Sequence, residues 1–499
     1  MMATVSRRTF IQGLASAPLA LWASRYAHAQ ETLLVRHDAS SAAGLEMLEI
    51  YAYAVAAMHR RSDNSPLSWL WQHYTHFVNG STTKEAEISR IFGSRYTLRR
   101  SLAEEMWNTC QSHAGQNANH FLPWHRMYVL FFENIVREVS GRPDFTLPYW
   151  NYTSTDPALR GVVPQAFRLP NDPVYGILYR PDRTWRANGG RPIHANQPGD
   201  AMDISDAMAK SNYSSSGGVQ GFCRAIDSGI HGRIHVLVGN RNNMGNVPYA
   251  ARDPLFWVHH SNIDRMWASW NRNGGVNPYT PVWARRQFVF ADTRSRRSST
   301  ELRAYYDIES LGYTYDDFIP APGSTPASAS TLMAAAGQTT TSAATPELVA
   351  RAKPADLGSR STRTMLRRVA GTPQTEVLGL AAAGADERTY LVLKDLHAWA
   401  QPEVLYHVYL TAGRGAVGPD NYVGSINFFD AEFHDHGGGR LDEALGENFF
   451  SFDVTDILRK VARRGHRDAR DALQVTFVPG GRPRADARPL VATIELVRQ

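Results

Sequence analysis

Residues 253–270, which read DPLFWVHHSNIDRMWASW, predict a long buried helix. Asp253 is a preferred N-cap residue, and Pro254 suits the first helical position, where its missing N–H would have no partner. At helical spacing, one face carries Phe256, His260, Ile263, Trp267 and Trp270. Adjacent side chains on a helix point about 100° apart. His260 is therefore the candidate metal ligand, and we expect His259 to support it or to be structural.

A second helix is predicted upstream, where residues 121–133 read FLPWHRMYVLFFE. Pro123 suits its first turn and Gly141 its end. Its apolar face carries His125. A single histidine on such a face is more often a core residue than a ligand, so its role depends on what faces it.

A third helix is expected between Pro66 and Gly80, and it carries His73 and His76. The two histidines are three residues apart and lie on neighbouring faces. Spacing alone leaves either of them as a ligand.

The loop between these helices adds further candidates. Residues 110–113 read CQSH, and His120 is a rival to His113. The chain has only two cysteines, Cys110 and Cys223, so it is not a disulfide scaffold. An exported protein could still join them in one bridge.

Residues 231–235, which read HGRIH, give the sharpest local signal. Positions i and i+4 of a helix share a face, so two imidazoles at this spacing can hold one ion. With the other helices, this makes two sets of three imidazoles, a donor type that suits copper, zinc or iron. A two-metal site of this kind would lie inside a helical bundle. We therefore predict a mainly α core.

Five segments resemble the tyrosinase and polyphenol oxidase family, the type 3 copper proteins. The two longest are FLPWHRMY at 121–128 and DPLFWVHHSNIDRMW at 253–267. Shorter similarities are LPYWNY at 147–152, HGRIHVLVG at 231–239 and GYTY at 312–315. The resemblance covers residues 46–318 and implies a cofactor of two copper ions.

The resemblance also assigns ligands. The first copper would be held by His76, His113 and His125, and the second by His231, His235 and His260. It favours His76 over His73 because the family ligand follows a Trp/Tyr-Gln segment by a few residues. Many relatives carry the middle ligand at the position of Gln116, whereas relatives with a longer loop after a Cys-Gln-x-His motif support His113.

Cys110 lies close to this middle ligand in the sequence. In some relatives of the family, a nearby cysteine is joined to the ligand by a thioether. Cys110 could form such a bond, pair with Cys223, or remain a free thiol.

The resemblance implies oxidation of o-diphenols to o-quinones with O2, with weaker ortho-hydroxylation of monophenols. Asp227 stands where plant-type relatives carry a glutamate that holds a water near the second copper; helix capping or a surface charge is the alternative. Gly232 replaces an asparagine that strong hydroxylases often have. Phe256 resembles the ring that stacks on bound substrate, or it packs in the core.

The chain changes character beyond residue 319. Residues 320–353 are crowded with Ser, Thr, Ala, Gly and Pro, which is typical of a linker. Short alternating runs further on, such as residues 390–393 and 473–478, predict strands. We therefore expect a catalytic domain over 30–319, a linker over 320–363 and an all-β, sandwich-like domain over 364–499.

FSFDVTD at 450–456 resembles, more faintly, a motif of the domain that follows the core in plant-type enzymes. There the domain covers the copper site and keeps the enzyme latent until it is removed. The linker would then be the place where an activating protease cuts.

The first 29 residues predict a twin-arginine export signal. Arg7 and Arg8 are followed by a weakly polar stretch over 11–22 and by Ala-His-Ala at 27–29. The mature chain would begin near Gln30, in the periplasm or outside the cell. Elsewhere, no stretch is long and apolar enough to span a membrane.

The amino-acid composition limits the classes of molecule that the protein is expected to bind. The formal net charge is +6, and no run of basic residues with interleaved aromatics suggests nucleic-acid binding. The expected partners are small phenols and O2. Three alternatives would use the same ligands: a tyrosinase with substantial monophenolase activity, an o-aminophenol oxidase, and an O2 carrier similar to haemocyanin.

Overall fold

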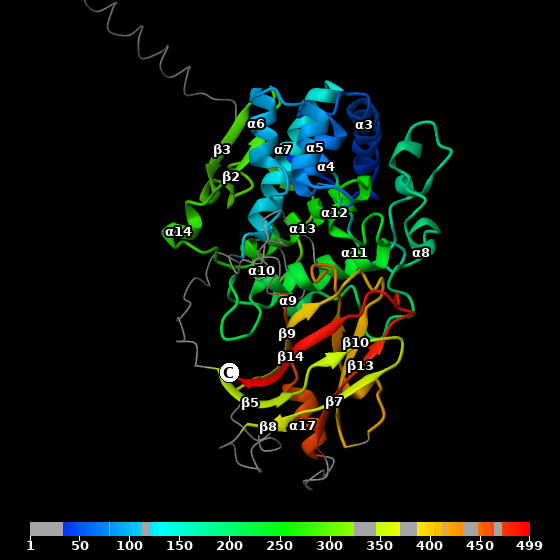
Figure 1. Cartoon of the computed structure of the whole chain (residues 1–499), viewed down its shortest axis with the longest axis vertical. Coiled ribbons are helices and arrows are strands. Elements are labelled where there is room, and N and C mark those ends of the chain that lie inside the picture. The colour runs from blue at the N-terminus through cyan, green and yellow to red at the C-terminus, as the bar shows by residue number, and fades with distance from the viewer. Residues whose placement is uncertain are drawn as a thin grey trace, which may run out of the picture.

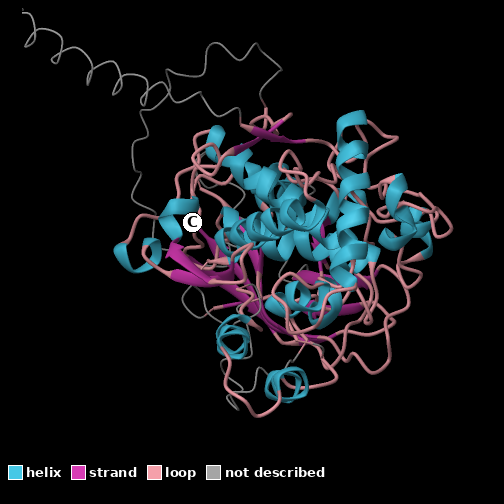
Figure 2. Cartoon of the chain, turned by 90° about the horizontal axis from the view of Figure 1, so that it is seen from above, coloured by secondary structure: helices cyan, strands magenta, loops and turns pink. Residues whose placement is uncertain are grey.

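The computed structural model describes residues 33–78, 80–111, 119–323, 346–369, 387–413, 415–432, 448–463 and 472–499. Described residues up to 323 form a helical part, and those from 346 onward form a β part (Figure 1). Seen from above, the helices overlie the strands (Figure 2). The predicted fold class, a mainly α core followed by a sandwich-like β domain, is confirmed. The predicted signal at 1–29 lies outside the described residues.

The helical part is built from helices of very different lengths. The longer ones are α3 (Ala42–His59), α4 (Trp69–His76), α5 (Lys84–Phe92), α6 (Leu98–Met106), α7 (Phe121–Ser140), α11 (Gly232–Val238) and α13 (Pro254–Arg272). Shorter turns are η1 (Gln165–Arg168), η2 (Tyr175–Leu178), α8 (Trp185–Asn188), α9 (Ser205–Met208), α10 (Phe222–Arg224), η3 (Ala225–His231), α12 (Val247–Ala250), α14 (Pro281–Ala284) and η4 (Leu302–Tyr305). None of the described helices is long and apolar enough to cross a lipid bilayer.

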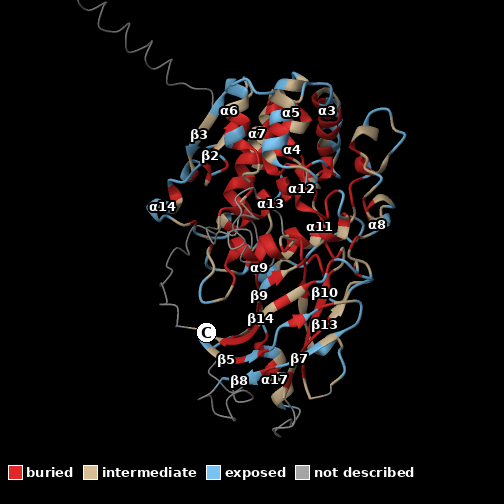
Figure 3. Cartoon of the chain, viewed as in Figure 1, coloured by how far each residue is buried: buried red, intermediate tan, exposed pale blue. Residues whose placement is uncertain are grey.

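Helices α7 and α13 form the buried centre of this part (Figure 3). Asp253 caps α13 as expected, because its carboxylate accepts the N–H of Leu255 at 2.9 Å. Gly141 ends α7 with φ 70°, a conformation that glycine adopts at little cost. Phe132 of α7 stacks on Trp257 of α13, with ring centroids 3.5 Å apart. This packing fixes the two helices that carry His125 and His260.

Two pairs of short strands complete the helical part. β1 (Leu34–Arg36) pairs in parallel with β4 (Tyr313–Tyr315), and β2 (Gln287–Ala291) pairs antiparallel with β3 (Arg297–Glu301). The first pair joins the beginning of the described chain to the end of the helical part.

A buried ionic network secures the β1–β4 pair to the central helices. Arg36 of β1 donates to Glu133 of α7 at 2.8 Å and to Asp264 of α13 at 3.0 Å. The hydroxyls of Tyr313 and Tyr315 donate to the same Asp264 carboxylate, at 2.6 and 2.7 Å. Burial alone would raise the pKa of the Asp264 carboxyl, but the neighbouring guanidinium groups hold it below its usual range.

The β part consists of two antiparallel sheets. Its strands are β5 (Glu347–Ala352), β6 (Ala355–Asp356), β7 (Thr362–Met365), β8 (Arg367–Arg368), β9 (Thr389–His397), β10 (Tyr406–Ala412), β11 (Tyr422–Ile426), β12 (Phe450–Asp453), β13 (Leu473–Pro479) and β14 (Leu490–Arg498). One sheet has the order β11-β10-β13-β7, and the other has the order β12-β9-β14-β5-β8, with β6 beside β14. Two short helices, η7 (Pro419–Asn421) and α17 (Thr455–Arg463), accompany them.

The sheets share one apolar core and begin earlier than the sequence indicated. Val408 of one sheet and Leu391 and Ile494 of the other belong to the same buried cluster. Strands β5 and β6, and the start of β7, precede residue 364, so the sheets include residues that were assigned to the linker. The reason is local: exposed charges at Glu347 and Arg351 interrupt the apolar alternation of β5.

Candidate metal centre

The segment that carries HGRIH is a distorted helix. Residues Ala225–His231 form the π-helical η3, and Gly229 leaves helical geometry at φ −79° and ψ −106° before α11 begins. The imidazoles of His231 and His235 still converge, with ring centroids 4.5 Å apart. Single π-helical turns are frequent at functional sites.

Backbone carbonyls fix the orientation of both rings. Nδ1 of His231 donates to the carbonyl of Asp227 at 3.1 Å, and Nδ1 of His235 donates to the carbonyl of Met244 at 2.6 Å. Their Nε2 atoms are buried and have no hydrogen-bond partner among the described residues. Such an arrangement selects the tautomer whose outer nitrogen can bind a metal.

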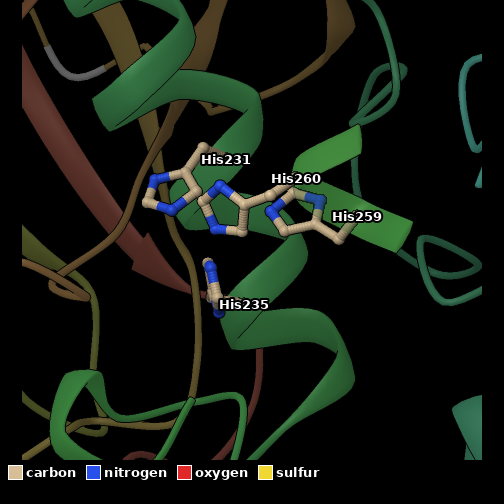
Figure 4. Close-up of side chains that lie close together, drawn as sticks. All are labelled: His231, His235, His259 and His260. Atoms are coloured by element: carbon tan, nitrogen blue, oxygen red, sulfur yellow. The ribbon is translucent and has the colours of Figure 1, made fainter. Parts of the chain in front are cut away.

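Helix α13 adds His259 and His260 to this group, and both are fully buried. Each of the four histidines offers a nitrogen within 4.8 Å of the others (Figure 4). His259 lies alongside His231, with ring centroids 5.6 Å apart and nearly parallel rings. Which of the two adjacent histidines binds the metal stays a prediction, with His260 as the expected ligand. His260 additionally stacks on His125 at 4.3 Å and lies between two histidine groups.

The second group comes from α4, α7 and the loop between them. Possible ligand atoms of His76, Cys110 and His125 lie within 4.8 Å of one another. Nδ1 of His125 donates to the carbonyl of Phe121 at 2.8 Å, and its Nε2 lies 3.6 Å from the sulfur of Cys110. No disulfide joins Cys110 to Cys223 in the structure.

The rival histidines have other contacts. Nε2 of His73 donates to the carbonyl of Pro248 at 2.9 Å, so His76 and not His73 joins the second group. His120 stacks on Trp283, with centroids 5.3 Å apart, and burial lowers its pKa to about 4. His113 belongs to residues 112–118, which lie outside the described residues.

The charge state of the first group suits a metal. Burial, followed by the neighbouring imidazoles, holds the pKa values of His235, His259 and His260 well below the ordinary histidine value. These rings are therefore neutral at physiological pH. Neutral imidazole is the form that binds metal ions.

Asp227 is buried rather than at the surface, which removes the surface-charge alternative. Its carboxylate accepts from Arg224 at 3.0 Å and lies 3.4 Å from Nδ1 of His231. Asp430 of the β part has an oxygen within 4.8 Å of this carboxylate and of His231. The sequence did not single out Asp430, because no local pattern connects it to a histidine almost 200 positions earlier.

The β part closes over the first histidine group. Phe429 stacks on the imidazole of His235, with centroids 4.0 Å apart and planes 7° apart. Gly232 has helical dihedrals, and a Cβ added to it would lie 2.4 Å from the side-chain oxygen of Asn427. Asn427 donates to the carbonyl of Ser228 at 2.7 Å. A side chain at position 232 would therefore collide with the β part.

Hydrogen bonds close to Gly232 also join the helical part to the β part. The side chain of Gln220 donates to the carbonyl of Phe449 at 2.6 Å, and its backbone N–H donates to the hydroxyl of Ser451 at 2.8 Å. Ser451 belongs to β12, the edge strand of its sheet, and Phe449 directly precedes that strand. All of these atoms are in buried residues, so the two parts are joined by more than the linker.

Comparison with known proteins gives the family. A family profile described as the common central domain of tyrosinase matches residues 67–203 and 179–273. Tyrosinase HcTyr1 of Hahella sp. (strain CCB-MM4) is 29% identical over 480 residues, which cover 90% of this chain and 96% of that protein. Residues 67–273 therefore carry the central domain of the tyrosinase family. The matched residues include the histidines of α4, α7, α11 and α13.

Plant members of the tyrosinase family match over shorter stretches. (+)-Larreatricin hydroxylase of Larrea tridentata is 31% identical over 224 residues, which cover 40% of this chain and 38% of that protein. Among solved structures, latent aurone synthase aligns with a TM-score of 0.58 at 19% identity, covering 93% of this chain and 89% of that one. Latent apple tyrosinase aligns with a TM-score of 0.56 at 20% identity, covering 94% and 97%. These structures share the fold, including the β part.

The tyrosinase family holds two copper ions, and the residues of this chain fit them. Both groups contain buried imidazoles, a donor type that suits copper. The unpartnered Nε2 atoms of His231 and His235 would otherwise leave polar atoms buried at a cost. A metal ion at this position satisfies them.

Proposed function

We propose that the protein oxidises o-diphenols to o-quinones with O2 at a pair of copper ions, and that it hydroxylates monophenols more slowly. The observation that carries this proposal is the convergence of buried imidazoles. Backbone carbonyls hold Nδ1 of His231 and of His235, which leaves their outer Nε2 atoms without a partner among the described residues. Bound copper supplies the electron exchange with O2, and the protein supplies binding and orientation. Two catechols each give up two electrons and two protons, and one O2 becomes two waters.

The proposed ligands are His76, His113 and His125 for one copper and His231, His235 and His260 for the other. His260 is preferred over His259 because its ring also stacks on His125, which places it beside the first copper's ligands. His259 would then act as a neighbour of the ligands rather than as a ligand.

The preference for diphenols rests on what surrounds His231. A monophenol has to lose its proton before hydroxylation, and a polarised water is the usual acceptor. Asp227 is placed to hold such a water, but Gly232 has no side chain to polarise it. The nearby amide of Asn427 donates to Ser228 and accepts from the N–H of Phe429 at 3.2 Å. Phe256 packs at 4.1 Å against His260 and would form the floor beneath a substrate ring.

Initial rates on catechol, a monophenol and an o-aminophenol test the activity of the copper-loaded protein. We expect catechol to be fastest. A faster monophenol rate would favour a full tyrosinase, a faster aminophenol rate would favour an aminophenol oxidase, and reversible O2 binding without turnover would favour an O2 carrier.

Copper content tests the ligands separately. We expect His260→Asn to lose one of the two copper ions and His259→Asn to retain both. His73→Asn is the matched control, because its ring binds only a backbone carbonyl. Loss of copper from the His259 variant alone would reverse the assignment.

We infer, in addition, that the β part keeps the enzyme latent. Phe429 occupies the face of His235 on which a substrate ring would otherwise lie. A protease would act in the linker, and the Gln220 contacts imply that the β part has to dissociate after cleavage. Cleavage followed by removal of the β part should raise the catechol rate. An unchanged rate after complete removal would reject latency.

The proposed cellular location is outside the cytoplasm, reached by the twin-arginine route. Its support is the order of features in residues 1–29. Replacing Arg7 and Arg8 by lysine should leave the protein in the cytoplasm. Continued export of that variant would contradict the route.

A further inference from the structure

A cavity of about 620 Å³ opens in the helical part, away from the proposed copper ligands. Its wall includes residues of α3 and α4 and loop residues near 180, 242 and 252. Within the described part of the chain, none of the proposed copper ligands lines it. The volume lies in the range of ligand pockets, which is about 300–1,000 Å³.

Three arginines line this cavity: Arg61, Arg180 and Arg252. No ion pair is formed by any of them with a described residue. Arg180 is half-buried, and its guanidinium donates only to the carbonyl of Arg252, at 3.3 Å. Burial lowers the pKa of this guanidinium, which nevertheless stays charged. Asp253 and Asp182 act on Arg180 without forming an ion pair with it. A partly desolvated cation with no counter-ion in contact favours an anion from solution.

The carboxylates at the same wall are largely engaged elsewhere. Asp253 is held by Arg183 through two bonds of 2.8 and 2.6 Å. Asp63 lies 3.5 Å from Arg90. Asp182, the third carboxylate at the wall, offsets one of the three arginines, so the cavity keeps a smaller excess of positive charge.

Two uncharged donors at the wall also lack partners. The indole nitrogen of Trp69 and the amide nitrogen of Asn243 are buried and make no hydrogen bond with described residues. The oxygen of Asn243 accepts the backbone N–H of Asn240 at 2.8 Å, which fixes the orientation of the amide. Asn243 is 97% buried, since its exposed fraction is 3%. Unpartnered buried donors are rare in proteins and call for an acceptor.

One acceptor at the wall is also free. Oδ1 of Asp182 is buried and has no hydrogen-bond partner among the described residues. A ligand that satisfies the whole wall accepts hydrogen bonds at several oxygens and donates one. Hydrogen phosphate and phosphate monoesters that keep a proton have this character, whereas sulfate has no proton to donate.

We propose that this cavity is a binding site for a phosphate-type oxyanion. Arg180 and the exposed Arg61 and Arg252 neutralise its charge, and Trp69 and Asn243 donate to its oxygens. The carboxylate of Asp182 accepts a hydrogen bond from the protonated phosphate oxygen, which sulfate cannot donate. The site is independent of the copper chemistry.

Isothermal titration calorimetry of the full-length, copper-loaded protein in Tris chloride at constant ionic strength tests the proposal. The probes are inorganic phosphate, glycerol phosphate and sulfate. We expect both phosphates to bind and sulfate to bind about tenfold more weakly, the effect of one charge-assisted hydrogen bond. Stronger binding of inorganic phosphate identifies a free-ion site, and stronger binding of glycerol phosphate identifies an ester site.

Variants make the result specific to this cavity. Arg180→Gln should weaken phosphate binding by about tenfold or more. Arg252→Gln, at an exposed position that cannot affect folding strongly, should also weaken it. Arg191→Gln is the matched control, because Arg191 is exposed and does not line the cavity. Asp182→Asn should raise sulfate binding toward that of phosphate.

Some outcomes would overturn the proposal. Absence of phosphate binding at millimolar concentration would do so. If Arg191→Gln and Arg252→Gln weakened phosphate binding equally, the binding would depend on the overall surface charge and not on this cavity.

Discussion

Replacing Gly232 by alanine puts one methyl group between the metal-binding helix and the β part. The backbone at Gly232 is helical, so alanine fits it and gains about 0.8–1 kcal/mol of helix propensity. That gain is the same in the docked and undocked states, so it does not change the docking equilibrium of the β part. The added Cβ would lie 2.4 Å from the oxygen and 2.7 Å from the nitrogen of the Asn427 amide. Contacts of this kind need about 3.5 Å, so Asn427 has to move by about 1 Å.

The cost of that movement has two parts. Overpacking of a well-packed interface costs about 1–3 kcal/mol. Displacing Asn427 also gives up its hydrogen bond to Ser228, which contributes about 1 kcal/mol. The docking equilibrium of the β part should therefore weaken by about 2–4 kcal/mol, which is about 30- to 1,000-fold.

The assay is O2 consumption with catechol by the intact, uncleaved chain. Gly232→Ala should raise the rate, and limited proteolysis should release the β part sooner. In an Asn427→Ala background, the same substitution should have little effect, because the obstructing amide is gone. An unchanged rate and unchanged proteolysis, or an equal effect in both backgrounds, would refute the docking role of Gly232.

Three further predictions concern other contacts. Phe429→Ala should raise the catechol rate of the intact chain by about two- to tenfold, since one aromatic stack is worth about 0.5–1.5 kcal/mol; a lower rate with copper retained would contradict this. Burial lowers the pKa of His407 to about 4, so below about pH 6.5 the unfolded chain binds a proton that the folded chain does not. The free energy of unfolding, measured by urea titration, should therefore fall as the pH drops from about 6.5 to about 4. In the His407→Gln variant it should fall less over the same range. An equal dependence on pH in the two proteins would mean that His407 does not cause the loss of stability. Asp264→Asn leaves Arg36 short of a counter-ion and should lower the free energy of unfolding by about 3–5 kcal/mol, whereas a loss below 1 kcal/mol in urea titration would mean that the network is dispensable.

The elements that the sequence predicted well are those with local signals. Asp253 and Pro254 begin α13, and Gly141 ends α7, because caps and glycine conformations depend on a few neighbouring residues. The fold class followed from the change of period between residues 319 and 364. α4 ends at His76, earlier than the expected stop at Gly80.

The parts that the sequence did not predict depend on distant contacts. Phe429 and Asn427 reach the histidines only because the two sheets dock on η3, and no spacing along the chain announces such a contact. The π-helical turn was also not foreseen, since it has no simple residue pattern. His231 at the end of this turn lies close to both His259 and His260 of α13.

The pairing of β1 with β4 has a consequence for how the protein can be rearranged. Arg36 and Tyr315 are direct partners, so the chain enters and leaves the helical part at one spot. The helical part therefore has the geometry of a cassette, in which a short bridge could join its own ends and new termini could be opened in a surface loop.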